Sequence, residues 1–328
     1  MTATEAAVNS LQPLSEIITA DYPAIPWLVE KLLRPGETTL LIGRQKEGKS
    51  TLALQLAIDV ATADPFLERF RTEPGRILYV DFENRPAQLK ARGLDLARGR
   101  DVRNVLIKSF DFLTQRDVGL FGKEAATLRA IIVEYEPALL ILDPLRFAAP
   151  RGGQSKDESW AVSIIDAVSS LRESSPDMAV LLIHHTRKRQ GQDQPVSLRD
   201  EPRMWIENSY GSQALLAHVD NIWGLEADSD GFTFATVARS HGLITLRLEK
   251  RPGSELFLPS EDLTASLTTA QRMYWNILPQ QFNWASAQKC GIPHGSLDRL
   301  MRAALAIGIL ETTPTKGTYR KVEIRQDA

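Results

Sequence analysis

The sequence predicts an α/β protein with a mostly parallel sheet and flanking helices, followed by a small C-terminal winged helix-turn-helix domain. Three observations lead to this fold class. Short, continuous apolar runs alternate with helical patterns, which is typical of strands buried on both faces of a parallel sheet. A glycine-containing loop joins the first apolar run to a helical segment. Beyond residue 268 the pattern becomes helical and short.

Five apolar runs are expected to form the parallel strands, with helical patterns between several of them. The strand candidates are Thr38–Ile42, Arg76–Val80, Asn104–Ile107, Ala138–Leu142 and Ala179–Ile183. The helical candidates are Thr51–Thr62, Glu124–Tyr135 and Trp160–Glu173. Two later runs, Phe232–Ala238 and Leu243–Leu248, predict an antiparallel hairpin at the edge of the sheet. We therefore expect residues 1–250 to form the first domain.

The rest of the chain predicts a linker and a second domain. Residues 251–268 are expected to be the linker, because they hold Pro252-Gly253, Pro259-Ser260 and scattered threonines. In residues 269–328, helices are predicted over Thr269–Leu278, Asn283–Cys290 and Ser296–Gly308, and a hairpin over Ile309–Thr313 and Thr318–Ile324. The first of these helices has its apolar positions at Met273, Tyr274, Ile277 and Leu278, and the third places Leu297, Leu300, Met301, Ala304 and Leu305 on one face. Three helices and a two-stranded wing are typical of a winged helix-turn-helix.

The loop after the first strand matches a phosphate-binding P-loop. It reads Gly43-Arg44-Gln45-Lys46-Glu47-Gly48-Lys49-Ser50, and Thr51 follows. Glycines let the backbone N–H groups point at phosphates, at the positive end of the helix dipole. Lys49 is expected to project into a solvent-filled site and reach the β- and γ-phosphate oxygens, and the Ser50 hydroxyl is expected to bind Mg²⁺. The sequence therefore predicts an ATP and Mg²⁺ site that includes residues 43–51.

A second metal ligand is predicted at Asp143, which ends the apolar run Leu139–Leu142. In a P-loop fold we expect this strand to neighbour the P-loop strand, so that Asp143 faces the Mg²⁺ or its water. Without the P-loop upstream, an ordinary turn aspartate before Pro144 would be the simpler interpretation.

Hydrolysis also needs a group that orients or deprotonates the attacking water. Glu83 lies just past the end of the second predicted strand, where we expect the γ-phosphate to project. Asp81 is the rival carboxylate, two residues earlier. A turn acid that caps the next helix is the structural alternative for both.

Two histidines end another apolar strand, in Leu182-Ile183-His184-His185-Thr186-Arg187-Lys188. Taken alone, the pair fits either satisfied turn residues or a sensor of the γ-phosphate. The polar stretch Arg189–Arg203 follows, rich in Gln, Asp and Arg.

Several of these motifs together resemble the RepA-like branch of the RecA-type ATPases, which includes plasmid-encoded hexameric replicative helicases. The resemblance is carried by Ile25–Val29, the P-loop, Val80–Glu83, Ile141–Pro144, the His184–Lys188 run, Asp157-Glu158 and Tyr210–Ala214. It spans about Pro13 to Leu248. It implies a RecA-like fold and a hexameric ring with ATP between subunits. It also implies Glu83 as the catalytic carboxylate, His185 as the γ-phosphate sensor, and Arg187–Arg203 as a channel loop that touches single-stranded DNA.

The resemblance also implies an arginine finger from the late hairpin, acting on the neighbouring subunit's ATP. That place reads Ala238-Arg239-Ser240-His241-Gly242, with one arginine and without the nearby lysine of the family. Arg239 is therefore the predicted finger, and an exposed edge-strand arginine is the alternative.

Composition restricts the partners and the compartment. The net charge is −2, but residues 270–328 hold eight Lys/Arg and four Asp/Glu and so carry +4. A DNA duplex is one expected partner of the second domain, with Ser296–Arg302 in the major groove and Lys316, Arg320 and Lys321 on phosphates. A protein partner is the other.

Cys290 is the only cysteine, and the sequence holds neither a membrane-spanning run nor a signal peptide, so we expect a cytoplasmic protein without a membrane partner.

The leading hypothesis is a Mg²⁺-dependent ATPase whose ring translocates on single-stranded DNA and unwinds duplex during plasmid, phage or mobile-element replication. The alternative is an ATP-controlled DNA-binding regulator or helicase loader whose winged helix carries the specificity. A small-molecule kinase fits less well, because nothing resembles a lid for an acceptor substrate.

Overall fold

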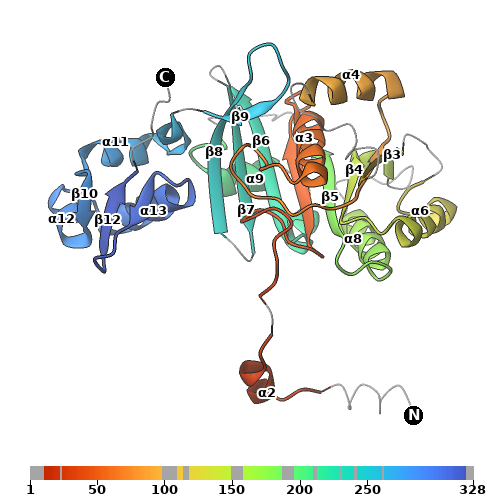
Figure 1. The fold of residues 1–328 in the computed structure, drawn as a ribbon, viewed down its shortest axis with the longest axis horizontal. Coiled ribbons are helices and arrows are strands. Elements are labelled where there is room, and N and C mark those ends of the chain that lie inside the picture. The colour runs from red at the N-terminus through yellow and green to blue at the C-terminus, as the bar shows by residue number, and fades with distance from the viewer. Residues whose placement is uncertain are drawn as a thin grey trace.

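The computed structural model describes residues 11–22, 24–97, 109–113, 118–148, 158–186, 196–209, 213–228, 231–239, 242–260 and 262–322. A nine-stranded sheet forms the centre of this part of the chain, in the order β3-β2-β4-β5-β1-β6-β7-β8-β9 (Figure 1). The strands are β1 (Thr38–Gly43), β2 (Ile77–Asp81), β3 (Phe110–Leu113), β4 (Leu139–Asp143), β5 (Ala179–His185), β6 (Asn221–Asp228), β7 (Gly231–Ala238), β8 (Gly242–Lys250) and β9 (Phe257–Pro259).

Neighbouring strands are parallel from β3 to β6 and antiparallel from β6 to β9. The predicted mostly parallel α/β sheet is therefore confirmed. One expectation about the strand order is wrong: β5 lies between β1 and β4, so the strand that ends at Asp143 does not neighbour the P-loop strand. The predicted strand Asn104–Ile107 lies outside the described residues.

Helices cover both faces of the sheet. They are α3 (Lys49–Thr62), α4 (Pro86–Leu96), α6 (Gly122–Tyr135), α7 (Leu145–Ala148), α8 (Glu158–Arg172), α9 (Pro202–Ser209) and α10 (Gln213–His218). The buried side chains of α3 share a core with Leu41 of β1, whereas those of α6 and α8 share a second core with Leu40 and Ile42. This alternation along β1 is what a strand buried on both faces requires.

The segment expected to be a linker instead continues the sheet. Phe257–Pro259 forms β9 and pairs with β8, and the short 3₁₀ helix η1 (Leu263–Ser266) follows. Gln55 of α3 fixes β9 in place: its amide donates to the Phe257 carbonyl at 2.9 Å and accepts from the Phe257 N–H at 2.9 Å. The P-loop helix is thus bonded directly to the chain that leads to the C-terminal residues.

Gln55→Ala is expected to lower the free energy of unfolding by about 2–4 kcal/mol, because it leaves both buried backbone groups of Phe257 without a partner. Gln55 is only 2% exposed, so water does not replace the lost amide. Urea unfolding measures the effect, and Gln288→Ala on the exposed surface of α12 (Trp284–Lys289) is the control. Equal stability of the two variants would contradict the role given to Gln55.

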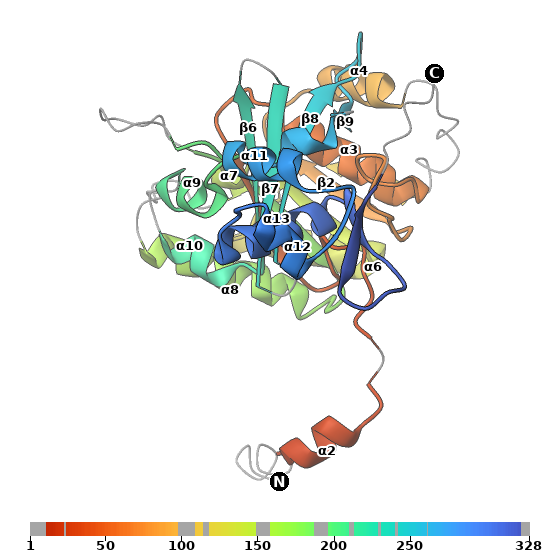
Figure 2. The same ribbon diagram turned by 90° about the vertical axis from the view of Figure 1, so that its left-hand side faces the viewer.

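The C-terminal unit contains three helices and a three-stranded sheet in the described residues. The elements besides α12 are α11 (Thr269–Ile277), β10 (Gln281–Asn283), α13 (His294–Ala306), β11 (Leu310–Thr312) and β12 (Thr318–Lys321), with strand order β10-β12-β11. The sequence predicted only two of these strands and missed β10. The unit packs beside β8 through α13 (Figures 1 and 2).

The buried face of α13 agrees with the predicted stripe except at Leu305, which is 37% exposed, whereas that of α11 does not agree. Leu297 and Leu300 are fully buried. On α11, however, Met273 is 68% exposed, and Trp275 is buried in its place. The apolar pattern of this short helix was therefore shifted by one position from the face that packs.

At the other end of the chain, α2 (Leu14–Thr19) stands apart from the sheet in both views (Figures 1 and 2). Among the described residues, no helix combines the length and the apolarity needed to cross a membrane.

Candidate functional site

The P-loop connects the carboxyl end of β1 to the first turn of α3, and both of its glycines are required by close contacts. A Cβ at Gly43 would lie 2.4 Å from the Leu225 carbonyl oxygen of β6. Gly48 has a φ of 93°, and a Cβ there would lie 2.7 Å from the Phe257 ring. Only glycine fits both positions without displacing β6 or β9.

Lys49 is buried inside the loop. Its side-chain Nζ donates to the Gly43 carbonyl at 2.8 Å and also to the Arg44 carbonyl. Burial lowers the pKa of Lys49 to about 8, and the negative charges of Glu47, Asp143 and Glu83 partly oppose this shift. We expected Lys49 to project into a solvent-filled site, and this is wrong, because the side chain is 2% exposed. Its ammonium group nevertheless faces the carboxylates of the site.

Glu47 holds the loop in its curved shape. Its Oε2 accepts the Arg44 N–H at 2.7 Å, and it also bonds the backbone of Ala227 on β6. Burial raises the pKa of Glu47 above its ordinary value. The motif placed Glu47 in the phosphate-binding set, and its contacts support the loop's backbone. Arg44, Gln45 and Lys46 form the exposed part of the loop.

Asp143 and Ser50 come together beside the P-loop and offer two oxygen ligands suited to Mg²⁺. The Asp143 carboxylate accepts the Tyr79 hydroxyl at 2.6 Å and also bonds Ser50. Burial raises the pKa of Asp143 to about 6. The described residues hold no group of three or more His, Cys, Asp or Glu that could bind a metal alone. Two protein oxygens fit a Mg²⁺ that takes its other ligands from phosphates and water.

The two rival carboxylates after β2 have different surroundings. Asp81 is buried, and its carboxylate accepts the Glu83 N–H at 2.9 Å, the Asn84 N–H at 2.8 Å and the Asn84 side-chain amide at 2.9 Å. Glu83 is exposed, and its charge reaches both Lys49 and Asp143. Asp81 therefore stabilises the turn, which leaves Glu83 as the carboxylate available to a water molecule.

The paired histidines lie directly beside the P-loop. Ile42 is opposite His184 and Gly43 is opposite His185 in the β1–β5 register, and the Thr186 N–H donates to the Gly43 carbonyl at 3.0 Å. Burial, together with the positive charges of Lys49 and Arg146, lowers the pKa of each histidine to about 4. Both imidazoles are therefore neutral near neutral pH, so either can accept or donate one hydrogen bond.

The buried His184 leads to a pH-dependent prediction. Its folded pKa of about 4 lies below the ordinary 6.5, so its contribution to stability is present above 6.5 and is lost as the pH falls toward 4. Asp143 acts oppositely: its pKa is raised from 3.8, so its contribution is present below 3.8 and is lost as the pH rises through about 6. We expect His184→Gln to remove only the first effect. Between about pH 6.5 and 4 this variant should lose less unfolding free energy than the wild type, by up to about 1.4 kcal/mol per pH unit.

Urea unfolding across this pH range measures the difference. The same substitution at the exposed His218 of α10 is the matched control. An identical pH dependence for the wild type and His184→Gln would contradict the assignment.

Arg146 is a cation near the site that we did not select from the sequence. It lies on α7, three residues after Asp143, and it is exposed. Its charge affects both histidines, which places it on their side of the sheet edge. The sequence signal that could have identified Arg146 is a basic residue shortly after the strand that ends at Asp143.

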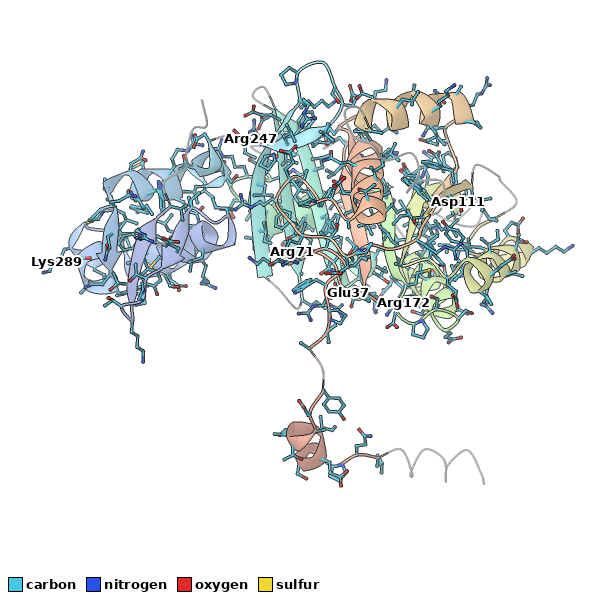
Figure 3. The ribbon with its side chains drawn as sticks, in the orientation of Figure 1. Glu37, Arg71, Asp111, Arg172, Arg247 and Lys289 are labelled. Atoms are coloured by element: carbon cyan, nitrogen blue, oxygen red, sulfur yellow. The ribbon has the colours of Figure 1, made fainter. Side chains whose placement is uncertain are left out.

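Arg239 lies beside the amino-terminal ends of the parallel strands, whereas the P-loop lies at their carboxyl ends. Its N–H donates to the Asp220 carbonyl at 3.1 Å, and its guanidinium donates to the Ala217 carbonyl. The amino-terminal side also holds Glu37, just before β1, and Arg172, at the end of α8 (Figure 3). Arg239 therefore cannot reach the phosphates bound by its own chain. Its neighbours Ser240 and His241 lie outside the described residues.

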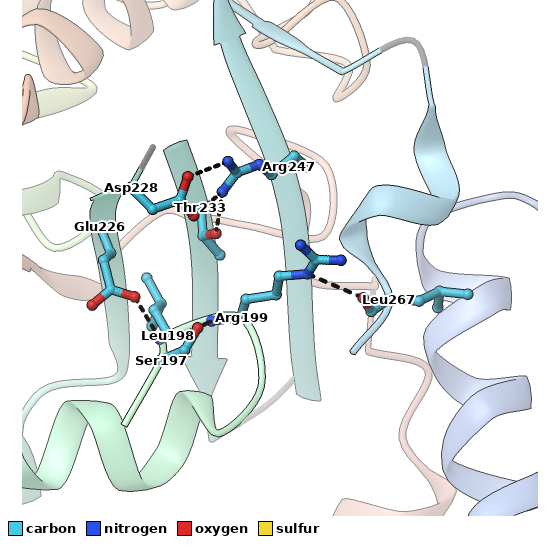
Figure 4. A network of polar contacts seen from close by, with 8 residues as sticks. All are labelled: Ser197, Leu198, Arg199, Glu226, Asp228, Thr233, Arg247 and Leu267. Carbon is cyan, nitrogen blue, oxygen red and sulfur yellow. Dashed lines mark hydrogen bonds and ion pairs between the residues drawn. The ribbon is translucent and has the colours of Figure 1, made fainter. Parts of the chain in front are cut away.

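Residues 187–195, the first half of the predicted channel loop, lie outside the described residues, as do Asp157 and Tyr210–Ser212. The second half of the predicted loop is tied to β6, because Glu226 accepts the Leu198 N–H at 2.7 Å (Figure 4). Just past the loop, the Trp205 indole N–H donates to the same carboxylate at 2.6 Å. Arg199 donates to the Leu267 carbonyl at 3.3 Å, just before α11. Thr186, the residue just before this loop, thus adjoins the P-loop, and Arg199, in the second half of the loop, adjoins the C-terminal unit.

Three of the cations predicted to bind DNA in the C-terminal unit have intramolecular partners. Arg302 pairs with Asp298, and Arg320 pairs with Glu311. The Lys321 side chain donates to the Trp275 carbonyl at 2.7 Å and to the Leu278 carbonyl at 2.6 Å. Lys321 therefore caps the end of α11. Lys316 is exposed in the turn before β12.

Comparison with known proteins identifies the family. A sequence model described as an AAA domain (AAA_25) matches residues 4–191, which is more than half of the chain. No curated protein matches the chain. A solved structure of a KaiC-like protein from the hyperthermophilic archaeon Pyrococcus horikoshii OT3 is similar, with a TM-score of 0.46 and 14% identity, over 71% of this chain and 93% of that chain. The chain belongs to the AAA domain family and is a P-loop ATPase.

Proposed function

We propose that this chain is a Mg²⁺-dependent ATPase that assembles into a hexameric ring, translocates on single-stranded DNA and unwinds duplex during the replication of a plasmid, phage or similar element. Lys49 would bind the transferred phosphoryl group, Ser50 and Asp143 would hold Mg²⁺, and Glu83 would orient the attacking water. Mg²⁺ supplies positive charge to the phosphate oxygens when it is bound. His185 would sense the γ-phosphate.

The observation that supports coupling to DNA most strongly is the position of His185. It lies beside Gly43, and residue 186 is bonded to the same glycine. The predicted channel loop begins one residue later. A hydrogen bond that forms or breaks at the γ-phosphate would therefore act on the first residue of the loop, as a motor requires.

Ring assembly is supported by the location of Arg239. In a head-to-tail ring each subunit presents one surface to the different surface of its neighbour. An arginine on the edge away from its own P-loop can then act on the ATP of the next subunit. Arg239→Ala is expected to lower hydrolysis by about 10³-fold or more while nucleotide binding persists.

Mixing variants tests this arrangement. Lys49→Ala and Arg239→Ala subunits are each inactive alone, but a mixed ring contains interfaces with an intact Lys49 on one side and an intact Arg239 on the other. Partial recovery of hydrolysis on mixing supports the finger in trans. No recovery after subunit exchange has been verified by labelled subunits contradicts it.

The first experiment is steady-state ATP hydrolysis with and without single-stranded DNA, with light scattering for the particle mass. DNA stimulation by a hexamer-sized particle supports the ring motor. Neutralising Arg187 and Arg189 should then remove the stimulation and leave basal hydrolysis. Weak hydrolysis that ignores DNA, from a monomer or dimer, contradicts the motor.

The second candidate is the regulator or loader, whose C-terminal winged helix would bind duplex DNA or a protein. It is supported by Arg299 and Arg302, both exposed on α13. The intramolecular pairing of Arg302 and Arg320 favours a protein partner over DNA phosphates. Loss of duplex binding in an Arg299→Ala, Arg302→Ala double variant would support the DNA-binding form of this candidate.

A further inference from the structure

Tyr79 of β2 makes a contact with the metal site that the mechanism above does not use. The side chain is buried, with 1% of its surface exposed. Its hydroxyl donates to Oδ2 of Asp143 at 2.6 Å. Tyr79 and Asp143 are 64 residues apart in the sequence, so only the pairing of β2 with β4 brings them together.

Two aromatic rings of β3 fix the direction of this hydroxyl. Phe112 is opposite Tyr79 in the β2–β3 register, with ring centroids 5.0 Å apart. Phe110 lies 6.5 Å from the Tyr79 ring and 4.8 Å from the Phe112 ring. A ring packed in this way keeps its hydroxyl aimed at one carboxylate oxygen.

The contact determines how Asp143 can bind a cation. A carboxylate binds Ca²⁺ through one or both oxygens at 2.3–2.6 Å, whereas Mg²⁺ needs near-octahedral geometry at about 2.0–2.1 Å. With Oδ2 occupied by the Tyr79 hydroxyl, bidentate binding is disfavoured. Ser50 bonds the same carboxylate and so lies beside it. This leaves Asp143 as a single-oxygen ligand, the mode that suits Mg²⁺.

We propose that Tyr79 is a positioning residue, which orients Asp143 for one-oxygen contact with Mg²⁺ and selects Mg²⁺ over Ca²⁺. The inference rests on Asp143 being a ligand of the proposed MgATP site. It needs neither a ring nor DNA. Its failure is therefore distinguishable from failure of the motor hypothesis.

Tyr79→Phe tests the proposal, because it removes the hydroxyl and keeps the ring. The affinity of a fluorescent ATP analogue is measured in EDTA, in Mg²⁺ and in Ca²⁺. We expect the affinity in EDTA to stay within about twofold of the wild type. The Mg²⁺ midpoint, which is the Mg²⁺ concentration that gives half of the maximal increase in affinity for the analogue, should rise about tenfold. A change of this size is usual when a residue that supports a metal ligand is lost. The advantage of Mg²⁺ over Ca²⁺ should shrink.

Tyr135→Phe is the matched control, because the negative charge that acts on the Tyr135 hydroxyl is that of Asp111 and not that of Asp143. A wild-type Mg²⁺ midpoint in Tyr79→Phe overturns the proposal. Equal weakening in EDTA and in Mg²⁺ also overturns it, since that result means general damage to the pocket. Asp143→Asn with a wild-type midpoint would instead refute the ligand assignment on which the proposal rests.

Phe112→Leu provides a second test should Tyr79→Phe fold poorly. It keeps the hydroxyl but loosens the ring that aims it, and Phe112 is partly exposed, so the fold should tolerate the change. We expect a smaller shift of the Mg²⁺ midpoint, about threefold, because the hydroxyl bond is kept and the effect stays below the roughly 10–100-fold loss typical of a deleted supporting contact. An unchanged midpoint in this variant overturns the proposal as well.

Discussion

Lys49→Ala is expected to lower ATP hydrolysis by about 10³-fold or more, because it removes the cation that meets the charge developing on the γ-phosphate. The surroundings of Lys49 strengthen this expectation. Its ammonium group is held by the Gly43 and Arg44 carbonyls, and burial has already lowered its pKa to about 8. A charge held in a fixed, desolvated position interacts more strongly with a phosphate than a solvated one does.

Lys49→Met separates the loss of charge from the loss of packing. It keeps an unbranched apolar stem in the buried site and should be as inactive as Lys49→Ala. The depressed pKa of Lys49 means that the buried charge costs about 3 kcal/mol at neutral pH. Removing the charge should therefore leave the free energy of unfolding equal or slightly higher. Lys123→Ala, on the exposed side of α6, is the control for loss of a lysine.

Steady-state hydrolysis and urea unfolding measure the two effects. Turnover within about tenfold of the wild type in either Lys49 variant would show that the P-loop assignment is wrong. Loss of folding in Lys49→Met would show that its hydrogen bonds to the loop outweigh the cost of burying its charge.

Local patterns were enough to predict the strands that bring the site together. β4 and β5 are continuous apolar runs that end in polar residues, and the apolar run of β1 ends at Gly43, the first residue of the P-loop. Because the carboxyl ends of parallel strands meet at one edge, the sequence alone could place Lys49, Asp143 and the histidines near one another. It could not give the strand order. The insertion of β5 between β1 and β4 is a non-local fact, so the predicted adjacency of β1 and β4 was wrong although Asp143 still reaches Ser50.

Short strands and long-range contacts were missed for a related reason. β9 is three residues long and contains Pro259, so its composition predicts a loop. Its position depends on Gln55, about two hundred residues earlier. The Tyr79 hydroxyl bond and the burial of Lys49 also depend on distant segments. The residues of the candidate site could therefore be selected from the sequence, whereas the long-range contacts that orient them or shift their pKa values could not.

Glu83→Gln should lower the rate of ATP hydrolysis by about 10²–10⁴-fold, the usual range for a general base, with little change in ATP affinity. Glutamine keeps the size of the side chain but cannot take a proton from water. Glu83 is exposed, and its charge faces Lys49 and Asp143. The fold should be unaffected.

Asp81→Asn is the informative comparison, because the sequence left these two carboxylates as rivals. The Asp81 carboxylate accepts three hydrogen bonds within the turn. Its replacement should therefore cost stability, about 1–3 kcal/mol, and should change the rate per folded molecule less than Glu83→Gln does. Single-turnover hydrolysis beside urea unfolding separates the two effects. If Asp81→Asn instead stops hydrolysis in a stable protein while Glu83→Gln stays active, the water is oriented from the turn itself, and Glu83 only contributes negative charge near Lys49.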